Sequence, residues 1–572
     1  MRKSLIVYLV FFVCTYVQTS LAQITPKWVE KAKRAVFSVI TYDKDGKMLN
    51  TGNGFFVSED GLALSDYTLF KGAESAEVVT ADGKKMPVDM ILGADYMYDV
   101  IKFKVAIIGK KVPALEITST VPEVGANIWM LPYSTQKSIA CESGKVKQTM
   151  KFEGSYNYYT LEMTMKDKMV SCPVMNEEGL VVGISQKASA NDVAGVCYAV
   201  DATFAMSRKI GALSLGDATL RSIGIRKGLP EEEDQALIYL MMASTQMSPE
   251  NYKQALDDFI KLFPSSAEGY YRRANYYVAN AKDDESLFEN ANKDFEEALK
   301  ITDKKDEVLY NKARLIYSYQ LSKPEKTYND WTYDKALENV REAIAQNPLP
   351  VYSQLEGDIL FAKQDYEGAL ACYEKVNASE LASPVTFFSA AKTKEIMKSD
   401  PKEVLALMDS CIAHCAQPLN AETAAYVLER AQMYMNANEP RKALLDYDTY
   451  FKAVDGQVND VFYYYREQAG LRSRQYQRAL DDIVKAIELN PKELTYQAEH
   501  AVINMRVGRN EEAAKILNQV LKDNPKYGEG YRLLGLCQIQ MKKNAEACNS
   551  FQKAKELGDP NVAPLIEKYC NK

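Results

Sequence analysis

The segment 168–173 contains the side chains best suited to covalent chemistry in the first half of the chain. Ser171 and Cys172 are nucleophile types, and Lys168 precedes them as a candidate base. A serine hydroxyl is a weak nucleophile until a base within hydrogen-bond reach takes its proton, and that base is most often histidine. Both histidines of the chain lie in its second half. The segment therefore predicts either no hydrolysis or an unusual hydrolysis with displaced residues.

A second group of chemically capable residues is Cys411, His414 and Cys415, which brings two sulfurs and an imidazole close together. These are zinc-ligand types, but no second ligand pair with zinc-finger spacing accompanies them, and the other histidine is His500. We therefore expect the two cysteines to be small buried residues on helices. We predict no metal and no cofactor.

Short strands must position the first of these segments. Residues 27–212 contain apolar runs such as Ala35–Ile40 and Gly54–Val57, separated by turns such as Asp43–Gly46. No amphipathic helix separates the strands, so parallel β-α-β units are disfavoured. Many short strands at near-regular spacing predict a β-barrel or β-sandwich.

From about residue 235 the apolar period becomes helical and a repeat is present. Its clearest form is an alanine, a large apolar residue four positions later, a small residue after three more, and a proline five beyond that. The full copies begin at Ala336, Ala479 and Ala513, and partial copies begin at Ala255, Ala291, Ala369, Ala443 and Ala547. Each unit is a helix pair that buries its apolar face only by stacking on its neighbours. The alanine allows close helix approach, the proline ends the second helix, and Gly357 and Gly535 lie where the helices of a pair should cross.

These residues resemble the tetratricopeptide repeat (TPR) over residues 235–570, in about nine helix pairs. The resemblance implies an all-α superhelical solenoid whose concave face binds peptides or protein segments; the alternative is a structural spacer. The tyrosines at 270–271, 276–277 and 463–465 could line such a face, although helical spacing favours packing for most of them. The sequence shows no coherent basic set that would clamp a terminal carboxylate.

Three landmarks in the first half resemble, in order and spacing, the trypsin-like serine proteases and most closely their bacterial high-temperature-requirement (HtrA-type) branch. They are Gly52-Asn-Gly-Phe-Phe-Val57, the segment Asp95–Lys104, and Val170-Ser-Cys-Pro173 followed by Gly179-Leu-Val-Val-Gly183-Ile. The resemblance implies an N-terminal all-β domain of two barrels over residues 27–212. It also implies a cleft between the barrels in which a peptide can lie as an added strand.

Residue by residue, the resemblance implies that the catalytic machinery is degenerate. Its register places Thr68 at the histidine, Asp99 at the aspartate, Val170 at the nucleophile and Lys168 at the oxyanion-hole glycine. Cys172 occupies the glycine before the proline. Valine is no nucleophile and threonine is no base near neutral pH, so we expect no catalytic residue; Ser171 or Cys172 is the fallback nucleophile.

The N-terminus predicts export. Arg2 and Lys3 precede an apolar run, and a small-x-small site predicts cleavage of a signal peptide, residues 1–22, after Ala22. A retained anchor is the alternative; otherwise we expect a periplasmic or extracellular protein with no stable membrane span. The nine remaining cysteines are an odd number, and their pairing is open. The net charge of −7 argues against nucleic acid as a partner.

Residues 213–234 form a glycine-containing linker that is either a hinge or packed between the domains. Together these observations predict an exported, non-catalytic scaffold that binds protein through the repeats and peptide through the degenerate protease domain. The alternative class is a serine-type endopeptidase using displaced residues. A weaker possibility places the repeats in envelope assembly or transport complexes. The sequence does not identify the partner or the oligomeric state.

Overall fold

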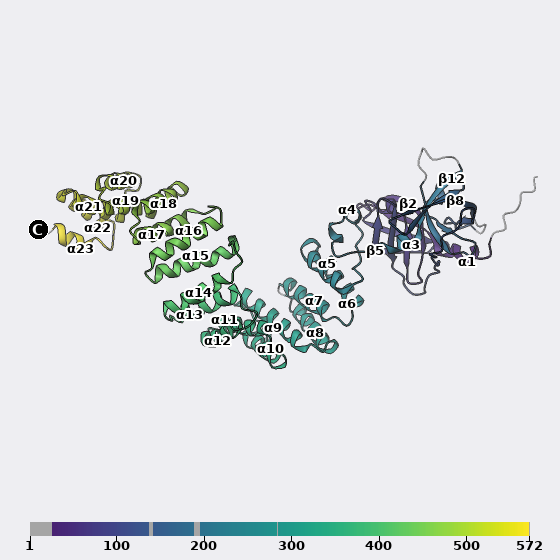
Figure 1. Cartoon of the computed structure of the whole chain (residues 1–572), viewed down its shortest axis with the longest axis horizontal. Coiled ribbons are helices and arrows are strands. Elements are labelled where there is room, and N and C mark those ends of the chain that lie inside the picture. The colour runs from purple at the N-terminus through teal and green to yellow at the C-terminus, as the bar shows by residue number, and fades with distance from the viewer. Residues whose placement is uncertain (1–25, 137–140, 188–194, 283, 571–572) are drawn as a thin grey trace, which may run out of the picture. The chain divides into compact units, whose positions relative to one another are not determined.

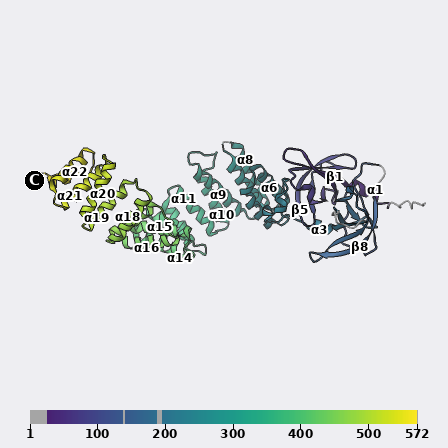
Figure 2. The same ribbon diagram turned by 90° about the horizontal axis from the view of Figure 1, so that it is seen from above.

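A computed structural model describes residues 26–136, 141–187, 195–282 and 284–570 of the chain. The predicted signal peptide, residues 1–22, lies outside the described residues. The chain divides into two compact units, residues 1–302 and 303–572, and each is described by itself. Figures 1 and 2 show strands only in the first unit and helices throughout the second.

The first unit begins with two closed antiparallel barrels of six strands each. The first barrel has the order β1-β2-β3-β6-β5-β4 and the second β10-β11-β12-β9-β8-β7. Period-two alternation forms these strands: in β1, Phe37, Val39 and Thr41 are buried and their neighbours Ser38 and Ile40 are less so. The strands of the first barrel are β1 (Val36–Tyr42), β2 (Met48–Phe56), β3 (Leu62–Ser65), β4 (Ser75–Thr80), β5 (Lys85–Asp95) and β6 (Val100–Val105). Those of the second are β7 (Asn127–Met130), β8 (Glu142–Phe152), β9 (Tyr156–Glu162), β10 (Pro173–Met175), β11 (Val181–Gln186) and β12 (Val196–Asp201).

Helices in consecutive antiparallel pairs follow the barrels. In the first unit they are α5 (Glu233–Gln246), α6 (Pro249–Leu262), α7 (Ala267–Asn280) and α8 (Glu285–Ile301). In the second unit they are α9 (Lys305–Ser322), α10 (Tyr333–Gln346), α11 (Pro350–Ala362), α12 (Tyr366–Asn377), α13 (Pro384–Ile396), α14 (Pro401–Ala413), α15 (Ala421–Asn436), α16 (Pro440–Ala453), α17 (Asp460–Arg472), α18 (Tyr476–Leu489), α19 (Leu494–Arg506), α20 (Asn510–Asp523), α21 (Gly528–Gln540), α22 (Asn544–Glu556) and α23 (Ala563–Cys570). The predicted fold class, a two-barrel all-β domain followed by an all-α repeat array, is confirmed.

The repeat residues act as their chemistry predicts. The leading alanines Ala443, Ala479 and Ala513 are fully buried. Helices α10, α18 and α20 each end two residues before a proline, which cannot continue the hydrogen-bond ladder. A side chain at Gly357 would lie 2.8 Å from the Tyr373 ring, so the helices of that pair cross closely, as expected.

Residues 213–228 pack on the first barrel. The apolar side chains of Ile223 and Ile225 are buried in the core of that barrel. The N–H of Gly228 donates to the carbonyl of Ile91 in β5 at 2.8 Å, and the N–H of Ile91 donates to the carbonyl of Arg226 at 2.9 Å. This segment therefore extends the barrel toward the first helix pair.

Two further contacts join the barrel to the repeats within the first unit. Tyr239 and Ala243 of α5 are buried in the same core as the barrel residues. The Arg226 guanidinium lies between two carboxylates: it donates to Asp89 of β5 at 2.6 Å and also to Asp258 of α6. Apolar burial and a three-residue ion pair thus bind α5 and α6 to the barrel.

One disulfide, Cys548–Cys570, ties α23 to α22. The other cysteines of the described residues are free thiols, and two of them, Cys411 and Cys415, are buried. His414, which lies between these two in the sequence, is exposed, and its Nδ1 lies 2.8 Å from the Ser410 carbonyl. Among the described helices, none is both long and apolar enough to cross a membrane.

Candidate functional site

Three segments that the protease resemblance singles out meet between the barrels. Thr68 lies in α2 (Tyr67–Phe70), Asp99 in the turn between β5 and β6, and Val170 directly after the 3-10 helix η2 (Asp167–Met169). The backbone N–H of Thr68 donates to Asp99 Oδ1 at 2.7 Å. The structure therefore brings together the residues assigned to the histidine and aspartate positions. Val170 is half-buried. The residue after it, Ser171, connects this segment to the one that contains Thr68.

Ser171 makes a buried hydrogen bond with Asp66. The Ser171 hydroxyl is fully buried and donates to Asp66 Oδ2 at 2.5 Å. Asp66 is the N-cap of α2, where its Oδ1 accepts the N–H of Leu69 at 3.2 Å. Burial and the nearby negative charge of Asp99 raise the pKa of Asp66 to about 6, against the opposing effect of the Ser171 hydrogen bond. The Ser171 hydroxyl is directed to a structural carboxyl and away from solvent.

The backbone of Ser171 has the conformation of a glycine. Its φ is +61°, in the left-handed region that a side chain other than glycine rarely adopts. The protease resemblance assigns a glycine to this position, immediately after the nucleophile. The observed φ agrees with that register, in which Val170 and not Ser171 occupies the nucleophile position.

Two side chains hold the carbonyls of this segment. Asn53 of β2 donates from Nδ2 to the carbonyls of Lys168 at 3.0 Å and Val170 at 2.7 Å, while its Oδ1 accepts the N–H of Tyr133 at 2.9 Å. The hydroxyl of Ser185 in β11 donates to the Met169 carbonyl at 2.5 Å. The segment is thereby fixed from both barrels.

The two N–H groups that follow the nucleophile position are engaged in the same network. The N–H of Ser171 donates to the Ser185 carbonyl at 2.9 Å, and the N–H of Cys172 donates to Ser185 Oγ at 2.9 Å. Both donors bind Ser185 of β11, so the turn after Val170 is fixed to the second barrel.

The remaining candidates are placed differently. The Cys172 side chain is fully buried, and desolvation raises the pKa of its thiol far above the ordinary value, so the reactive thiolate is disfavoured. The Lys168 side chain is exposed. His414 follows α14 and His500 lies in α19, both within the second unit.

Sequence reasoning did not single out Asn53, Asp66 or Ser185. A local signal existed for Asp66, because aspartate before a short helical segment is a common N-cap. No local signal existed for the contacts of Asn53 and Ser185, since each joins residues distant in the chain.

On the repeats, most of the singled-out tyrosines pack, and one borders a hollow. Tyr271 and Tyr277 are buried, whereas Tyr465 is 46% exposed. Tyr465 lies at a hollow of about 820 Å³ whose other lining residues include Gln432 of α15 and Tyr450 of α16. This hollow is large enough for several side chains of a bound segment.

Comparison with known proteins matches one segment in each half of the chain to a family model. Residues 52–184 match the model of the trypsin-like peptidase domain, and residues 499–562 match a tetratricopeptide-repeat model. The first match contains Thr68, Asp99 and Val170. The chain therefore carries a trypsin-like peptidase domain and tetratricopeptide repeats, as the resemblance implied.

The curated relatives include two proteins whose names state that they contain tetratricopeptide repeats. The small glutamine-rich tetratricopeptide repeat-containing protein 2 of Mycosarcoma maydis is 30% identical over 91 residues, 16% of this chain and 26% of that protein. The mitochondrial import receptor subunit TOM70 of Homo sapiens is 24% identical over 201 residues, 34% of this chain and 31% of that protein. A TPR repeat-containing protein of Methanocaldococcus jannaschii is 24% identical over 241 residues, 40% of each chain. The matches thus span less than half the length of these relatives.

Proposed function

We propose that this chain, in which a trypsin-like peptidase domain precedes tetratricopeptide repeats, is an exported protein-binding scaffold without peptidase activity. The repeats recruit a protein partner through their concave face. The trypsin-like domain binds an extended peptide in the cleft between its barrels and does not cleave it.

The observation that carries this proposal is the environment of Asp99. In a serine peptidase the carboxylate at this position orients an imidazole, which takes the proton of the serine. Here its Oδ1 accepts the backbone N–H of Thr68, and residues 1–302 contain no histidine. Without a base, and with valine at the nucleophile position, the acyl-transfer mechanism has no first step.

The buried Ser171 supports the same conclusion against the alternative function, a serine-type endopeptidase with a displaced nucleophile. Its hydroxyl donates to Asp66, while the Lys168 side chain is exposed. A carbonyl substrate would have to displace a buried hydrogen bond to reach this oxygen. Cys172, the other fallback, is equally buried.

The activity test uses the purified full-length protein, an unfolded labelled casein and a fluorophosphonate probe. We expect the labelled casein to bind, measured by fluorescence anisotropy, and to remain uncut for hours at equimolar protein. We expect no covalent adduct by mass spectrometry. An adduct mapped to Ser171 or Cys172 and abolished by Ser171→Ala or Cys172→Ala would establish the peptidase alternative. Ser119→Ala, which removes an exposed hydroxyl on the same domain, is the matched control.

Export is supported by the N-terminal pattern and by the Cys548–Cys570 disulfide, since disulfides persist in oxidising compartments. We expect the protein isolated from its native cells to begin at Gln23 by intact mass. We also expect a peptide pair that joins Cys548 to Cys570 under non-reducing conditions. An N-terminus at Met1 in a cytosolic fraction, with both thiols open to alkylation, would contradict export. It would not bear on the binding proposal, which the casein experiment tests separately.

A further inference from the structure

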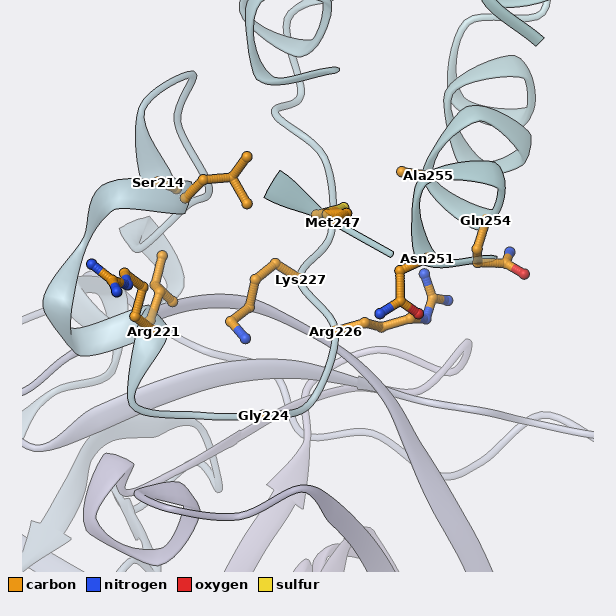
Figure 3. A pocket seen from close by; sticks show the side chains of 11 residues that line it. Ser214, Arg221, Gly224, Arg226, Lys227, Met247, Asn251, Gln254 and Ala255 are labelled. Carbon is orange, nitrogen blue, oxygen red and sulfur yellow. The ribbon is translucent and has the colours of Figure 1, made fainter. Parts of the chain in front are cut away.

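A small pocket lies in the first unit, between the segment that follows the second barrel and the first helix pair. Its volume is about 180 Å³, and residues 214–227 line one side while Met247 and α6 line the other (Figure 3). At about 30 Å³ for each water of the liquid, this space equals roughly six waters. The pocket therefore accepts a ligand the size of one short side chain with its polar head.

The pocket contains an ammonium group with no carboxylate partner. Lys227 Nζ donates to the carbonyls of Ile223 at 2.6 Å and Ile225 at 2.5 Å, and among the described residues it forms no ion pair within 4.0 Å. An ammonium has three donors, so one remains for a ligand. Burial lowers the pKa of Lys227 to about 8, and the more distant charge of Glu74 offsets this only in part.

Two arginines flank Lys227 in Figure 3, and they differ in what holds them. Arg226 is neutralised by Asp89 and Asp258. Arg221, in the last turn of α4 (Ala218–Arg221), is exposed, and its guanidinium has no acidic or carbonyl partner among the described residues. The pocket lining thus includes two cations, Arg221 and Lys227, that form no ion pair within 4.0 Å among the described residues. The Arg221 guanidinium points away from Lys227 in Figure 3 and would have to turn toward it when a ligand binds.

The rest of the wall is mostly apolar. Leu215 and Leu220 line one side, and Met247 and Ala255 line the other. A phosphate, which requires polar partners around all its oxygens, matches this wall poorly. A carboxylate with a short aliphatic tail matches it, because its head can pair with the cations while its tail contacts the apolar side chains.

We propose that this pocket binds a short aliphatic carboxylate through Lys227 and Arg221, at the junction of the barrel and the repeats. Two sources share this chemistry: a free short-chain acid and the C-terminal residue of a peptide. Either one would contact the 214–227 segment and α6 together. The site is separate from the segment around Ser171 and does not depend on the proposed scaffold function.

The test is titration calorimetry on the full-length protein with four probes: butyrate, N-acetyl-alanyl-valine, the C-terminal amide of that dipeptide, and inorganic phosphate. We expect at least one of the two carboxylates to bind at least tenfold more tightly than the amide and phosphate. Butyrate alone would indicate a free acid, and the dipeptide acid alone would indicate a peptide C-terminus. Equal binding of acid and amide, binding of phosphate alone, or no binding of either carboxylate at millimolar concentration overturns the proposal.

Variants and pH separate binding from a structural role. Arg221→Gln removes an exposed cation that makes no hydrogen bond to the fold, and we expect at least a fivefold weaker carboxylate affinity. Lys227→Met should remove both the affinity and its pH dependence. In the unaltered protein, affinity should fall between pH 7 and pH 9, with proton uptake seen as buffer-dependent heat at pH 8. Lys110→Met, an exposed lysine of the same unit, is the matched control. Unchanged affinity in Arg221→Gln together with a flat pH profile contradicts the assignment.

Discussion

Replacing Arg430 by Met is expected to reduce the local free energy of unfolding of α15 and α16 by about 3 kcal/mol. Arg430 of α15 donates to both oxygens of Asp446 in α16, at 2.8 and 2.7 Å, and to Asp409 of α14 at 2.7 Å. The Asp446 side chain is only 7% exposed, and burial raises its pKa against the opposing charge of Arg430. Removing the guanidinium leaves this carboxylate uncompensated, which is the costly way to break a buried ion pair.

Native-state hydrogen exchange on the full chain measures this effect, because repeat arrays open locally. We expect the slowest amides of α15 and α16 to exchange about a hundredfold faster in Arg430→Met, equivalent to about 3 kcal/mol. The double variant Arg430→Met with Asp446→Leu should recover most of this loss, since it leaves no buried charge. Arg441→Met, an exposed arginine in α16, serves as the control. Exchange within twofold of the unaltered protein in Arg430→Met would show that the ion pair contributes nothing.

Glu467→Gln is expected to stabilise the region of α17 and α19, and to do so only at neutral and alkaline pH. Glu467 is fully buried, its Oε1 has no hydrogen-bond partner, and Gln468 donates to its Oε2 at 2.7 Å. It occupies the helix crossing, twelve residues before Ala479, where other repeats have Gly357 or Gly535. Burial, and then the negative charges of Glu499 in α19 and Asp482 in α18, raise its pKa from 4.5 to about 8.

This raised pKa determines the direction in which stability changes with pH. Below about pH 4.5 the carboxyl is protonated in both the folded and the unfolded state and costs nothing. Between pH 4.5 and 8 the unfolded state ionises first, so stability falls as the pH rises, by about 1.4 kcal/mol per unit. The neutral glutamine removes this dependence, and we expect a gain of about 4 kcal/mol at pH 8 and of less than about 1 kcal/mol at pH 5.

Hydrogen exchange of α17 and α19 at the two pH values, corrected for intrinsic rates, measures the difference. Glu342→Gln changes an exposed glutamate of α10 and should alter neither value. A gain of the same size at pH 5 and pH 8 would attribute the effect to packing. No gain at pH 8 would show that Glu467 is ionised at no cost.

The fold was largely predictable because each half has its own period. In segments such as Ala35–Ile40, apolar side chains at every second position predict strands. The spacing from the leading alanine to the proline predicts helix pairs that end before Pro348, Pro491 and Pro525. The two-barrel arrangement came from resemblance, since strand patterns alone do not distinguish a barrel from a sandwich. The packing of residues 213–228 was left open, because its glycines are compatible with either alternative.

The candidate site was predictable only in part. Register alone placed Thr68 beside Asp99, and the structure brings them within hydrogen-bond distance. The contacts that fix the site join residues far apart in the chain: Ser171 to Asp66 across 105 positions, and Asn53 to Val170 across 117. Pairs at such distances leave no local pattern, so a single sequence does not reveal them.

The ion pairs of Arg226 have a consequence for the repeat array as an independent module. In three repeats an aspartate three residues after the leading alanine pairs with an arginine of the helix before it. These pairs are Asp294 with Arg273, Asp446 with Arg430, and Asp482 with Arg466. In the first repeat the aspartate is Asp258, α5 contains no arginine, and the guanidinium comes from Arg226, which also binds Asp89 of the barrel. The repeats grafted onto another protein would therefore begin with a carboxylate that has lost its guanidinium partner and keeps only the longer, 3.8 Å ion pair with Lys261. The two halves of this chain are thus not interchangeable parts.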